Sequence, residues 1–325
     1  MRALVYHRTG PARTVLAIED RPRAAPGPGE VSVRLHASGV NPHDTKARSG
    51  WTGRAVAPGG VIPHSDGAGV IEATGPGVDP ARRGKRVFTI NAPHDKGTAA
   101  EAIVLPETHV FDLPDPFSFA EGACLGVPAF TAWLAVLGDG PVEAQVVLIQ
   151  GGGGSVGRVA VELAALSGAR VIATGRTERS RAVAAARGAQ VVLPVDADRV
   201  IEAVMDLSGG KGASRIVEVD FAANQIIDAD AIAMHGAIAS YSCSSDRTPP
   251  LDYYAFARKA ARLTFVQGLA LTDADRQAAA QTLGRHFAAG HLRPDIAATY
   301  PLADAAAAHE AVEAGAPANI VVTID

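Results

Sequence analysis

A run of glycines directly after a short apolar stretch constrains the fold of this chain more than any other feature. Residues Val146–Gly157 read VVLIQGGGGSVG, and Val146–Ile149 are typical of a buried parallel strand. The next segment, Val156–Leu166, has the apolar spacing of a helix. A strand, a glycine turn and a helix in this order predict a dinucleotide site, because N–H groups at a helix N-terminus bind phosphate.

Three of these glycines have separate roles in such a turn. Gly151 allows the tight bend, Gly154 lets the backbone approach a diphosphate, and Gly157 lets the helix pack closely on the strand. The helix N-terminus adds about half a positive charge. The predicted phosphate-binding residues are Gly151, Gly153, Gly154, Ser155, Val156 and Gly157.

Composition and charge exclude several classes of protein. The chain has 325 residues, 47% hydrophobic and 20% charged, which is ordinary for a globular protein of two domains. A net charge of −4 implies no general affinity for nucleic acid or acidic membranes. The two cysteines, Cys124 and Cys243, have no CxxC partner, so we expect neither a disulfide framework nor a structural zinc cluster.

Nothing at the N-terminus resembles a signal peptide, and the longest nearly apolar stretch, Cys124–Leu137, is ~14 residues and too short to span a bilayer. We therefore predict a cytoplasmic protein without a membrane partner. No Gly-x-Ser-x-Gly motif indicates a serine hydrolase, and the glycine run lacks the Gly-Lys-Ser/Thr of a phosphate-loop NTPase.

Periodicity predicts an α/β chain with a β-rich first third. Expected strands there are Val31–Ser38, Gly69–Thr74, Arg86–Ile90 and Ala100–Val104. The middle of the chain alternates strands and helices, which predicts a doubly wound parallel sheet of six strands. Its expected strands are Val146–Gln150, Arg170–Thr174, Gln190–Leu193, Arg215–Val219, Ala237–Tyr241 and Leu263–Val266. Its expected helices are Val156–Ser167, Glu178–Arg187, Asp198–Ser208 and Ala223–Met234, followed by Asp273–Ala289.

A nucleotide-binding domain in mid-chain implies that both ends of the chain share the other domain. We expect one domain from residues 1–121 and 296–325, where a helix at Ala303–Ala314 and a strand at Ile320–Ile324 complete it, and a second domain from residues 122–295. The cleft between two such domains is the natural place for an active site.

Several segments together resemble the zinc-independent quinone oxidoreductase branch, close to ζ-crystallin, of the medium-chain dehydrogenases/reductases. The matching segments are Ala37–Gly50, Ile62–Val78, Gly84–Phe88, Gly97–Glu107, Glu121–Val136 and Gly168–Arg181. The resemblance implies a GroES-like β-rich domain, a Rossmann domain and a dimer or larger oligomer, of which we expect a homodimer.

Zinc-dependent members of that family place ligands where this chain has Asn41, Ser65 and Val127. None of these three is a usual zinc ligand, so we expect no metal. His64 is interpreted as a polar residue at a strand entry. A bound zinc would instead require a site built from His43, His64 and Asp66.

The end of the second strand of the nucleotide-binding sheet indicates which cofactor binds. Thr174 and Gly175 stand where NAD-binding units carry an acidic residue, and Arg176, Arg179 and Arg181 follow. Guanidinium groups suit a 2′-phosphate, so the sequence predicts NADP(H) with Arg176 and Arg179 as its ligands. Arg181 is either a further ligand or part of a solvated helix start.

By resemblance, the loop that contains Asn41 faces the substrate, and Thr131 contacts the cofactor near its nicotinamide. Asp44 is expected to anchor this loop by pairing with Arg48, with proton donation as the alternative. Lys46 either polarises a carbonyl or lies on the surface. The predicted catalytic residues are Asn41, Asp44 and Lys46. Further cofactor contacts are predicted at Asn41, Tyr241, Ser242, Phe265, Gln267 and Asn319. The substrate pocket is predicted at Trp51, Tyr241 and Tyr253. The alternative role of these aromatic residues, and of Tyr254, is packing within the protein.

The sequence therefore predicts an NADPH-dependent reductase of a small quinone that needs no metal. An alternative is reduction of an enone or alkenal double bond. A second alternative, from a different class, is a non-catalytic NADPH-binding protein.

Overall fold

The computed structural model describes residues 1–90 and 92–324, and the chain divides into two compact units. The first unit comprises Met1–Val127 and Gly284–Asp325, and the second comprises Pro128–Leu283. The domain bounds given above from the sequence remain a prediction. Each unit is described by itself.

The second unit is built on a parallel sheet in which six described strands follow the order β10-β9-β8-β11-β12-β13. The strands are β8 (Val146–Ile149), β9 (Arg170–Thr174), β10 (Val191–Leu193), β11 (Ala213–Glu218), β12 (Ile232–Ser240) and β13 (Arg262–Phe265). This is the strand order of the doubly wound dinucleotide-binding fold, so the predicted fold class is confirmed.

Helices cover both faces of this sheet. They are α5 (Ser155–Leu166), α6 (Glu178–Ala186), α7 (Ala197–Ser208) and α8 (Phe221–Ala231). Other helices assigned in or beside this unit are α4 (Val127–Leu137), α9 (Tyr253–Ala257) and α10 (Asp273–Ala288). Neighbouring residues of β9 point to opposite faces: Ile172 packs with Val200 and Val204 of α7, whereas a side chain at Gly152 would meet Ala173.

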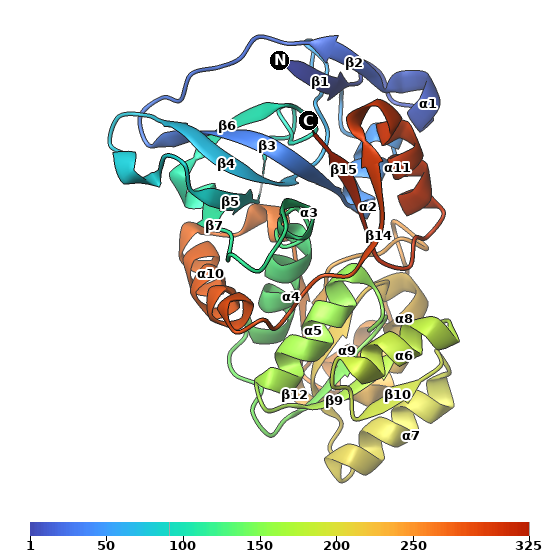
Figure 1. Cartoon of the computed structure of the whole chain (residues 1–325). Coiled ribbons are helices and arrows are strands. Elements are labelled where there is room, and N and C mark those ends of the chain that lie inside the picture. Colours follow the sequence, from blue (N-terminus) through green and yellow to red (C-terminus); the bar gives the residue numbers. More distant parts are fainter. Residues whose placement is uncertain (91, 325) are drawn as a thin grey trace. The chain divides into compact units, whose positions relative to one another are not determined.

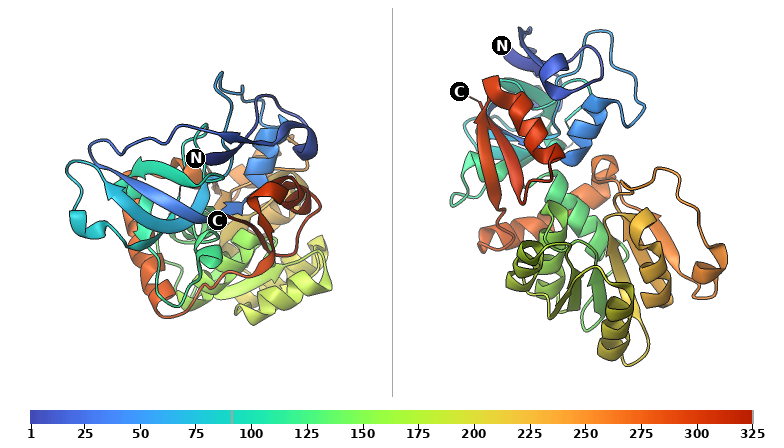
Figure 2. Two further views of the ribbon diagram at one scale, coloured as in Figure 1. Left: turned by 45° about the horizontal axis from the view of Figure 1, so that its top comes forward. Right: turned by 90° about the vertical axis from the view of Figure 1, so that its right-hand side faces the viewer.

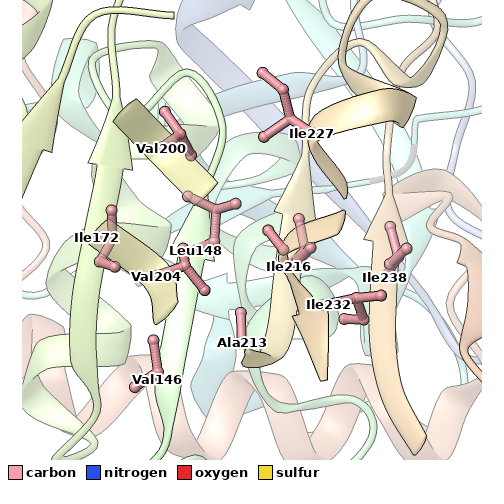
Figure 3. Packing of buried hydrophobic residues seen from close by; sticks show 11 residues of the cluster. Val146, Leu148, Ile172, Val200, Val204, Ala213, Ile216, Ile227, Ile232 and Ile238 are labelled. Carbon is pink, nitrogen blue, oxygen red and sulfur yellow. The ribbon is translucent and has the colours of Figure 1, made fainter. Parts of the chain in front are cut away.

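The fully buried side chains of the core beneath α7 are aliphatic. Figure 3 shows Leu148 and Ile172 on the strands next to Val200 and Val204 of α7, all four fully buried. The spacing of Val200 and Val204 places both on one face of α7. α7 starts where the Asp196 carboxylate accepts the N–H of Arg199. The cap thus stabilises the start of the helix, and the apolar face stabilises its packing on the sheet.

The expected strand and helix bounds agree with the structure to within a few residues, with one clear error. The helix predicted for Ala223–Met234 ends at Ala231, and residues from Ile232 onward form β12. Ile232 pairs with Ala213 of β11, so pairing within the sheet overrides the helix propensity of the alanines and Met234. Tyr241 and Ser242 lie just after β12, and Gln267 lies two residues beyond β13.

The first unit is built on a mostly antiparallel sheet of order β14-β15-β3-β4-β5-β7, with β6 paired to β3. Its strands are β3 (Glu30–Val40), β4 (Asp66–Thr74), β5 (Arg86–Thr89), β6 (Ala102–Pro106), β7 (Val110–Asp112), β14 (Ile296–Pro301) and β15 (Asn319–Thr323). A separate pair, β1 (Arg2–Val5) and β2 (Ala17–Asp20), is antiparallel.

Both ends of the chain contribute to this unit. β15, near the C-terminus, pairs with β3, and α11 (Ala305–Glu313) lies against β14 and β15 (Figures 1 and 2). α11 also contacts α2 (Pro42–Ser49), and the short helices α1 (Ala12–Val15) and α3 (Phe119–Gly122) complete the unit. β14 escaped prediction because its side chains alternate between half-buried and exposed positions and include three alanine or proline residues.

Within the described residues, no helix combines the length and the apolar character that crossing a bilayer requires.

The aliphatic core generates a first prediction. Leu148 is completely buried in the middle of β8, so Leu148→Ala should lower the free energy of unfolding by roughly 2–5 kcal/mol. Ile226 on α8 is 72% exposed, and Ile226→Ala serves as the control with an expected change below about 0.5 kcal/mol. Urea unfolding followed by circular dichroism measures both. Equal losses in the two variants would contradict the assigned core.

Candidate active site

The turn between β8 and α5 leaves no room for side chains at two of its glycines. A Cβ on Gly157 would lie 2.1 Å from the carbonyl oxygen of Gly151, and a Cβ on Gly153 would lie 2.5 Å from the carbonyl oxygen of Ser180. Gly151 itself has a φ of +71°, in the left-handed region. Helix α5 therefore packs onto the turn as closely as a bare backbone allows.

The N-terminus of α5 has no side-chain cap. Gly154 occupies the cap position, and no side chain accepts the N–H groups of the first turn. The first N–H groups of a helix have no partner inside it, so those of Ser155, Val156 and Gly157 are donors for an external anion. This geometry fits the diphosphate of a dinucleotide.

A buried arginine that the sequence analysis missed braces this turn. Arg158 is 1% exposed, and its guanidinium donates to the carbonyl oxygens of Gly153 (2.6 Å) and Gly154 (3.3 Å). Side chains on a helix point back toward its N-terminus, so an arginine four residues after Gly154 is placed to reach the turn. That spacing is the signal that would have identified it.

A chain of buried hydrogen bonds runs from the glycine turn to the neighbouring strands. The N–H of Gly151 donates to Thr174 Oγ1 (3.1 Å), and the Thr174 hydroxyl donates to Gln150 Oε1 (2.7 Å). Gln150 Nε2 donates to Asp228 Oδ1 (3.3 Å), and the Asp228 carboxyl interacts electrostatically with that of Glu218. Burial, followed by the mutual repulsion of the two charges, raises the pKa of Asp228, and burial raises the pKa of Glu218. Both shifts favour the protonated forms of these carboxyls.

The arginines after β9 differ in their contacts. Arg176 and Arg179 are exposed, and within the described residues neither makes a hydrogen bond or an ion pair. Arg181 donates to the carbonyl oxygen of Gly175 (3.1 Å) and so helps to hold the turn after the strand. Two uncommitted guanidinium groups thus lie where an acidic residue would stand in an NAD-binding unit.

The other predicted cofactor residues of the second unit have different degrees of exposure. Thr131 is buried in α4, and a Cβ on Gly268 would lie 2.2 Å from its hydroxyl, so the segment after β13 passes close to this threonine. Tyr241 and Ser242 are half-buried and Gln267 is exposed. Phe265 is 78% exposed, which is unusual for an aromatic side chain.

In the first unit, the loop before α2 is fixed by carboxylates. The N–H of Asn41 donates to Asp44 Oδ2 (2.7 Å), and Asn41 Nδ2 donates to Asp66 Oδ2 (2.8 Å). Both oxygens of Asp66 also accept the N–H of Val127, at 2.8 and 2.9 Å. Burial nevertheless raises the pKa of Asp66 to about 7, the hydrogen bonds from Asn41 and Val127 offsetting only part of this effect. Asn41 and Asp44 are themselves buried and act within the loop as structural partners.

Asp44 does not pair with Arg48, contrary to the sequence-based expectation. The Arg48 guanidinium donates to the carbonyl oxygen of Gly10 and to Glu313 on α11. The oxygens of Asp44 are already used at the N-terminus of α2, where Oδ2 accepts the backbone N–H of Asn41 and Oδ1 lies beside His43 Nε2. Arg48, one turn further along, is the buried link between α2 and α11.

His43 has one nitrogen close to two oxygens. Its Nε2 lies 2.9 Å from the hydroxyl oxygen of Ser65 and 3.0 Å from Asp44 Oδ1. Burial alone would lower the pKa of His43, but the charge and hydrogen bond of Asp44 outweigh it and the net pKa is raised. The same pairing lowers the pKa of Asp44 against the effect of its burial.

His64 is part of a second, neutral network. Its Nδ1 lies 2.8 Å from the hydroxyl oxygen of Ser38, and its Nε2 lies 3.0 Å from Nε2 of His309 on α11. The Ser38 hydroxyl is also 2.7 Å from that of Thr98. Burial lowers the pKa of His64 to about 4 and that of His309 to about 3, so both rings are uncharged near neutral pH. His64 precedes β4, as predicted, and the network gives it a structural role.

The remaining predicted site residues lie at the surface of their units. Lys46 Nζ lies 4.7 Å from the centre of the Trp51 ring, a cation–π contact. Tyr253 and Tyr254 are about two-thirds exposed and contact each other edge to face, so they do not form a buried pocket wall. Asn319 in β15 donates through Nδ2 to the carbonyl oxygen of Asp295 (2.9 Å).

The three positions at which zinc-dependent relatives carry ligands are occupied here by hydrogen-bonding or apolar groups. Asn41 bonds to Asp66, Ser65 bonds to His43, and Val127 contributes its backbone N–H. Across residues 1–90 and 92–324, no three His, Cys, Asp or Glu side chains are grouped so as to hold a metal ion. His43, His64 and Asp66 therefore do not form the alternative metal site.

Comparison with known proteins gives consistent matches along the chain. A family model of alcohol dehydrogenase GroES-like domains matches residues 27–115, and one of zinc-binding dehydrogenases matches residues 167–318. The quinone oxidoreductase of Sus scrofa is 32% identical over 293 residues, which cover 88% of this chain and 85% of the relative.

Solved structures match over the whole length. An NAD-dependent alcohol dehydrogenase superposes with a TM-score of 0.88 at 29% identity, covering 100% of both chains. A mycobacterial protein in complex with NADPH superposes with a TM-score of 0.86 at 28% identity, also covering 100% of both chains.

The buried Asp66 generates a pH prediction. Its pKa is about 7 in the folded protein against 3.8 ordinarily, so its contribution to stability is full below about pH 4 and is lost as pH rises through 7. Asp66→Asn removes this titration. Between pH 4 and pH 8, the free energy of unfolding should fall by roughly 2–4 kcal/mol less in Asp66→Asn than in the unmodified protein. Urea midpoints measured across this range provide the test, and parallel pH curves for the two proteins would refute it.

Proposed function

The chain belongs to the quinone oxidoreductase branch of the medium-chain dehydrogenases/reductases, and on that premise we propose that it reduces quinones with NADPH and without a metal. As a member of this family it is an oxidoreductase that uses a nicotinamide cofactor. The cofactor form, the acceptor and the residue roles given below belong to the proposal.

The observation that carries the proposal is the set of groups at the three zinc-ligand positions. An amide, a hydroxyl and a backbone N–H, all engaged in hydrogen bonds, replace the ligands of a metal at Asn41, Ser65 and Val127. An unactivated alcohol needs a metal or a strong base to lose its proton as the hydride leaves. A quinone is already electrophilic, and it suits a site that offers hydrogen bonds only.

The cofactor site is proposed at the turn between β8 and α5. NADPH supplies the hydride when bound. The N–H groups of Ser155, Val156 and Gly157 would hold its diphosphate, and Arg158 would keep the carbonyl groups of the turn in place. Asn41, Asp44 and Lys46 remain the proposed residues on the substrate side, the first two as positioning residues because their side chains are bonded within the loop.

The choice of NADPH over NADH rests on this chain's own residues, because one similar structure is an NAD-dependent enzyme and another holds NADPH. Arg176 and Arg179 are exposed and uncommitted within the described residues, and no acidic residue follows β9 directly. A guanidinium pairs with phosphate oxygens, whereas a ribose hydroxyl would favour a carboxylate.

Loss of one of these arginines should therefore affect the two cofactors differently. Arg176→Ala should weaken NADPH binding by roughly 10- to 100-fold and leave NADH binding unchanged, since a hydrogen bond to a charged group is worth about 1.5–3 kcal/mol. Arg199→Ala, at an exposed arginine of α7, is the matched control. Fluorescence titration with both cofactors provides the measurement. Equal affinities for NADPH and NADH in the unmodified protein would overturn the assignment.

Reduction of an enone or alkenal is a second candidate, and one observation favours it. Adding a hydride to an enone leaves an enolate, which requires a proton. The paired His43 and Asp44 provide an acidic N–H beside the loop that contains Asn41. A quinone needs this assistance less, because its reduced oxygen is a weaker base.

Steady-state NADPH oxidation with a naphthoquinone, a short alkenal and an aldehyde, together with NADP⁺ reduction by ethanol, tests the function. We expect turnover with the quinone or the alkenal and none with ethanol. Product analysis then separates the two chemistries. Robust alcohol oxidation without quinone or alkenal turnover would refute the proposal. Tight NADPH binding with no turnover on any substrate would identify a binding protein instead.

A further inference from the structure

The hydrogen bonds of His43 fix which of its nitrogens is committed to the protein. Nε2 lies within hydrogen-bond distance of both Asp44 Oδ1 (3.0 Å) and Ser65 Oγ (2.9 Å). Asp44 also accepts the N–H of Asn41, and its pKa is lowered, so it is a carboxylate and only accepts. The proton between the two residues therefore belongs to Nε2, and the Ser65 oxygen acts as a second acceptor for it.

The other nitrogen of His43 is not used by the protein. Within the described residues Nδ1 has no hydrogen-bond partner, and about 35% of the side chain is exposed. This arrangement differs from the Ser–His–Asp relay of hydrolases, in which the carboxylate and the hydroxyl bind opposite nitrogens. Here both bind the same nitrogen, so Ser65 cannot be activated as a nucleophile, and the ring presents a single N–H outward.

We propose that His43 is the proton donor of the reductase, and that it gives the Nδ1 proton to the oxygen of the reduced substrate. This inference rests on the proposed function. Reduction adds a hydride to a carbon of the enone or quinone and moves an electron pair onto a carbonyl oxygen. That oxyanion takes the Nδ1 proton as the Nδ1–H bond breaks. His43 is left as the neutral tautomer that bears its hydrogen on Nε2, and water restores the proton on Nδ1.

The charges around His43 support this role. Asp44 on α2 and Asp66 on β4 favour its charged form, whereas burial and Lys46 on α2 oppose it, and the net effect raises its pKa. The other groups near enough to interact are the histidines His64 and His94, whose own pKa values are lowered. The hydrogen bond from Nε2 to Asp44 is present before and after proton transfer, so the ring does not need to reorient.

Asp44, the predicted alternative proton donor, and Lys46, predicted to polarise a carbonyl, are both less suited to proton donation than His43. Asp44 is a buried carboxylate with both oxygens engaged and a lowered pKa, which excludes it as an acid near neutral pH. The ammonium of Lys46 lies over the Trp51 ring. His43 is the remaining group of the α2 loop that combines a raised pKa with an uncommitted N–H.

The test compares His43→Gln with the unmodified protein in NADPH-dependent reduction of an alkenal and a naphthoquinone from pH 6 to 9. The unmodified protein should lose kcat as pH rises, because His43 must carry its proton. His43→Gln should lower kcat with the alkenal by about 100- to 10,000-fold, remove this high-pH decline and leave the NADPH dissociation constant unchanged. The loss with the quinone should be smaller.

His7→Gln is the matched control, because His7 also pairs with a carboxylate, Glu19, at 2.8 Å, but at an exposed position and with no hydrogen bond to a proposed site residue among the described contacts. It should leave kcat and its pH dependence unchanged. Asp44→Asn is the second variant, in case His43→Gln does not fold. It should move the high-pH decline to lower pH, and NMR titration of the His43 ring should show the same movement in the absence of any substrate.

The possible outcomes separate the two proposals. Turnover by the unmodified protein, with kcat and pH profile intact in His43→Gln, would overturn the role of His43 and leave the proposed function standing. An unmoved His43 titration in Asp44→Asn would also overturn the role. Absence of turnover with every quinone and alkenal would overturn the proposed function and this inference together.

Discussion

The closeness of α5 to the end of β8 is the constraint on which the nucleotide-binding unit depends. A single Cβ at Gly157 would collide with the backbone of Gly151, so the first turn of the helix can approach the strand only without it. That approach leaves the helix N-terminus uncapped beside the strand end. Arg158 and the network from Thr174 to Asp228 then hold the surrounding backbone, which would otherwise be free to relax into the space a ligand needs.

The two units solve the problem of buried polar groups in different ways. In the second unit, burial raises the pKa of both Asp228 and Glu218 and so disfavours two negative charges side by side. In the first, His64 and His309 are both neutral and bond to each other, while the Asp44 carboxylate beside His43 raises the pKa of that ring. Each solution removes a net buried charge, which is the most expensive state available to such side chains.

The sequence predicted the doubly wound sheet because strands such as β8 and β9 are largely apolar and the glycine run follows β8 almost at once. It also placed both chain ends in one unit. It failed where pairing decides the outcome: Ile232 to Met234 have helical composition but extend β12 because β11 offers them partners. The site was less predictable. Asn41 and Asp44 were identified by resemblance, but the partner of Asp44 is His43 and that of Arg48 is Glu313, and contacts over 265 positions leave no local pattern. Arg158 was missed because arginine on a helix is normally exposed.

The pairing of β15 with β3 has a consequence for how the chain is made. β3 emerges from the ribosome early, but its neighbour lies almost at the C-terminus, about the whole length of the chain later. The second unit is continuous in sequence and is complete before that neighbour has been synthesised. Until β15 has been synthesised, the edge of β3 that it will cover therefore keeps its backbone N–H and C=O groups unpaired, and its apolar face stays partly uncovered. During this interval the nascent chain carries a complete second unit and an unfinished sheet, so the uncovered edge of β3 is where non-native strand pairing can occur.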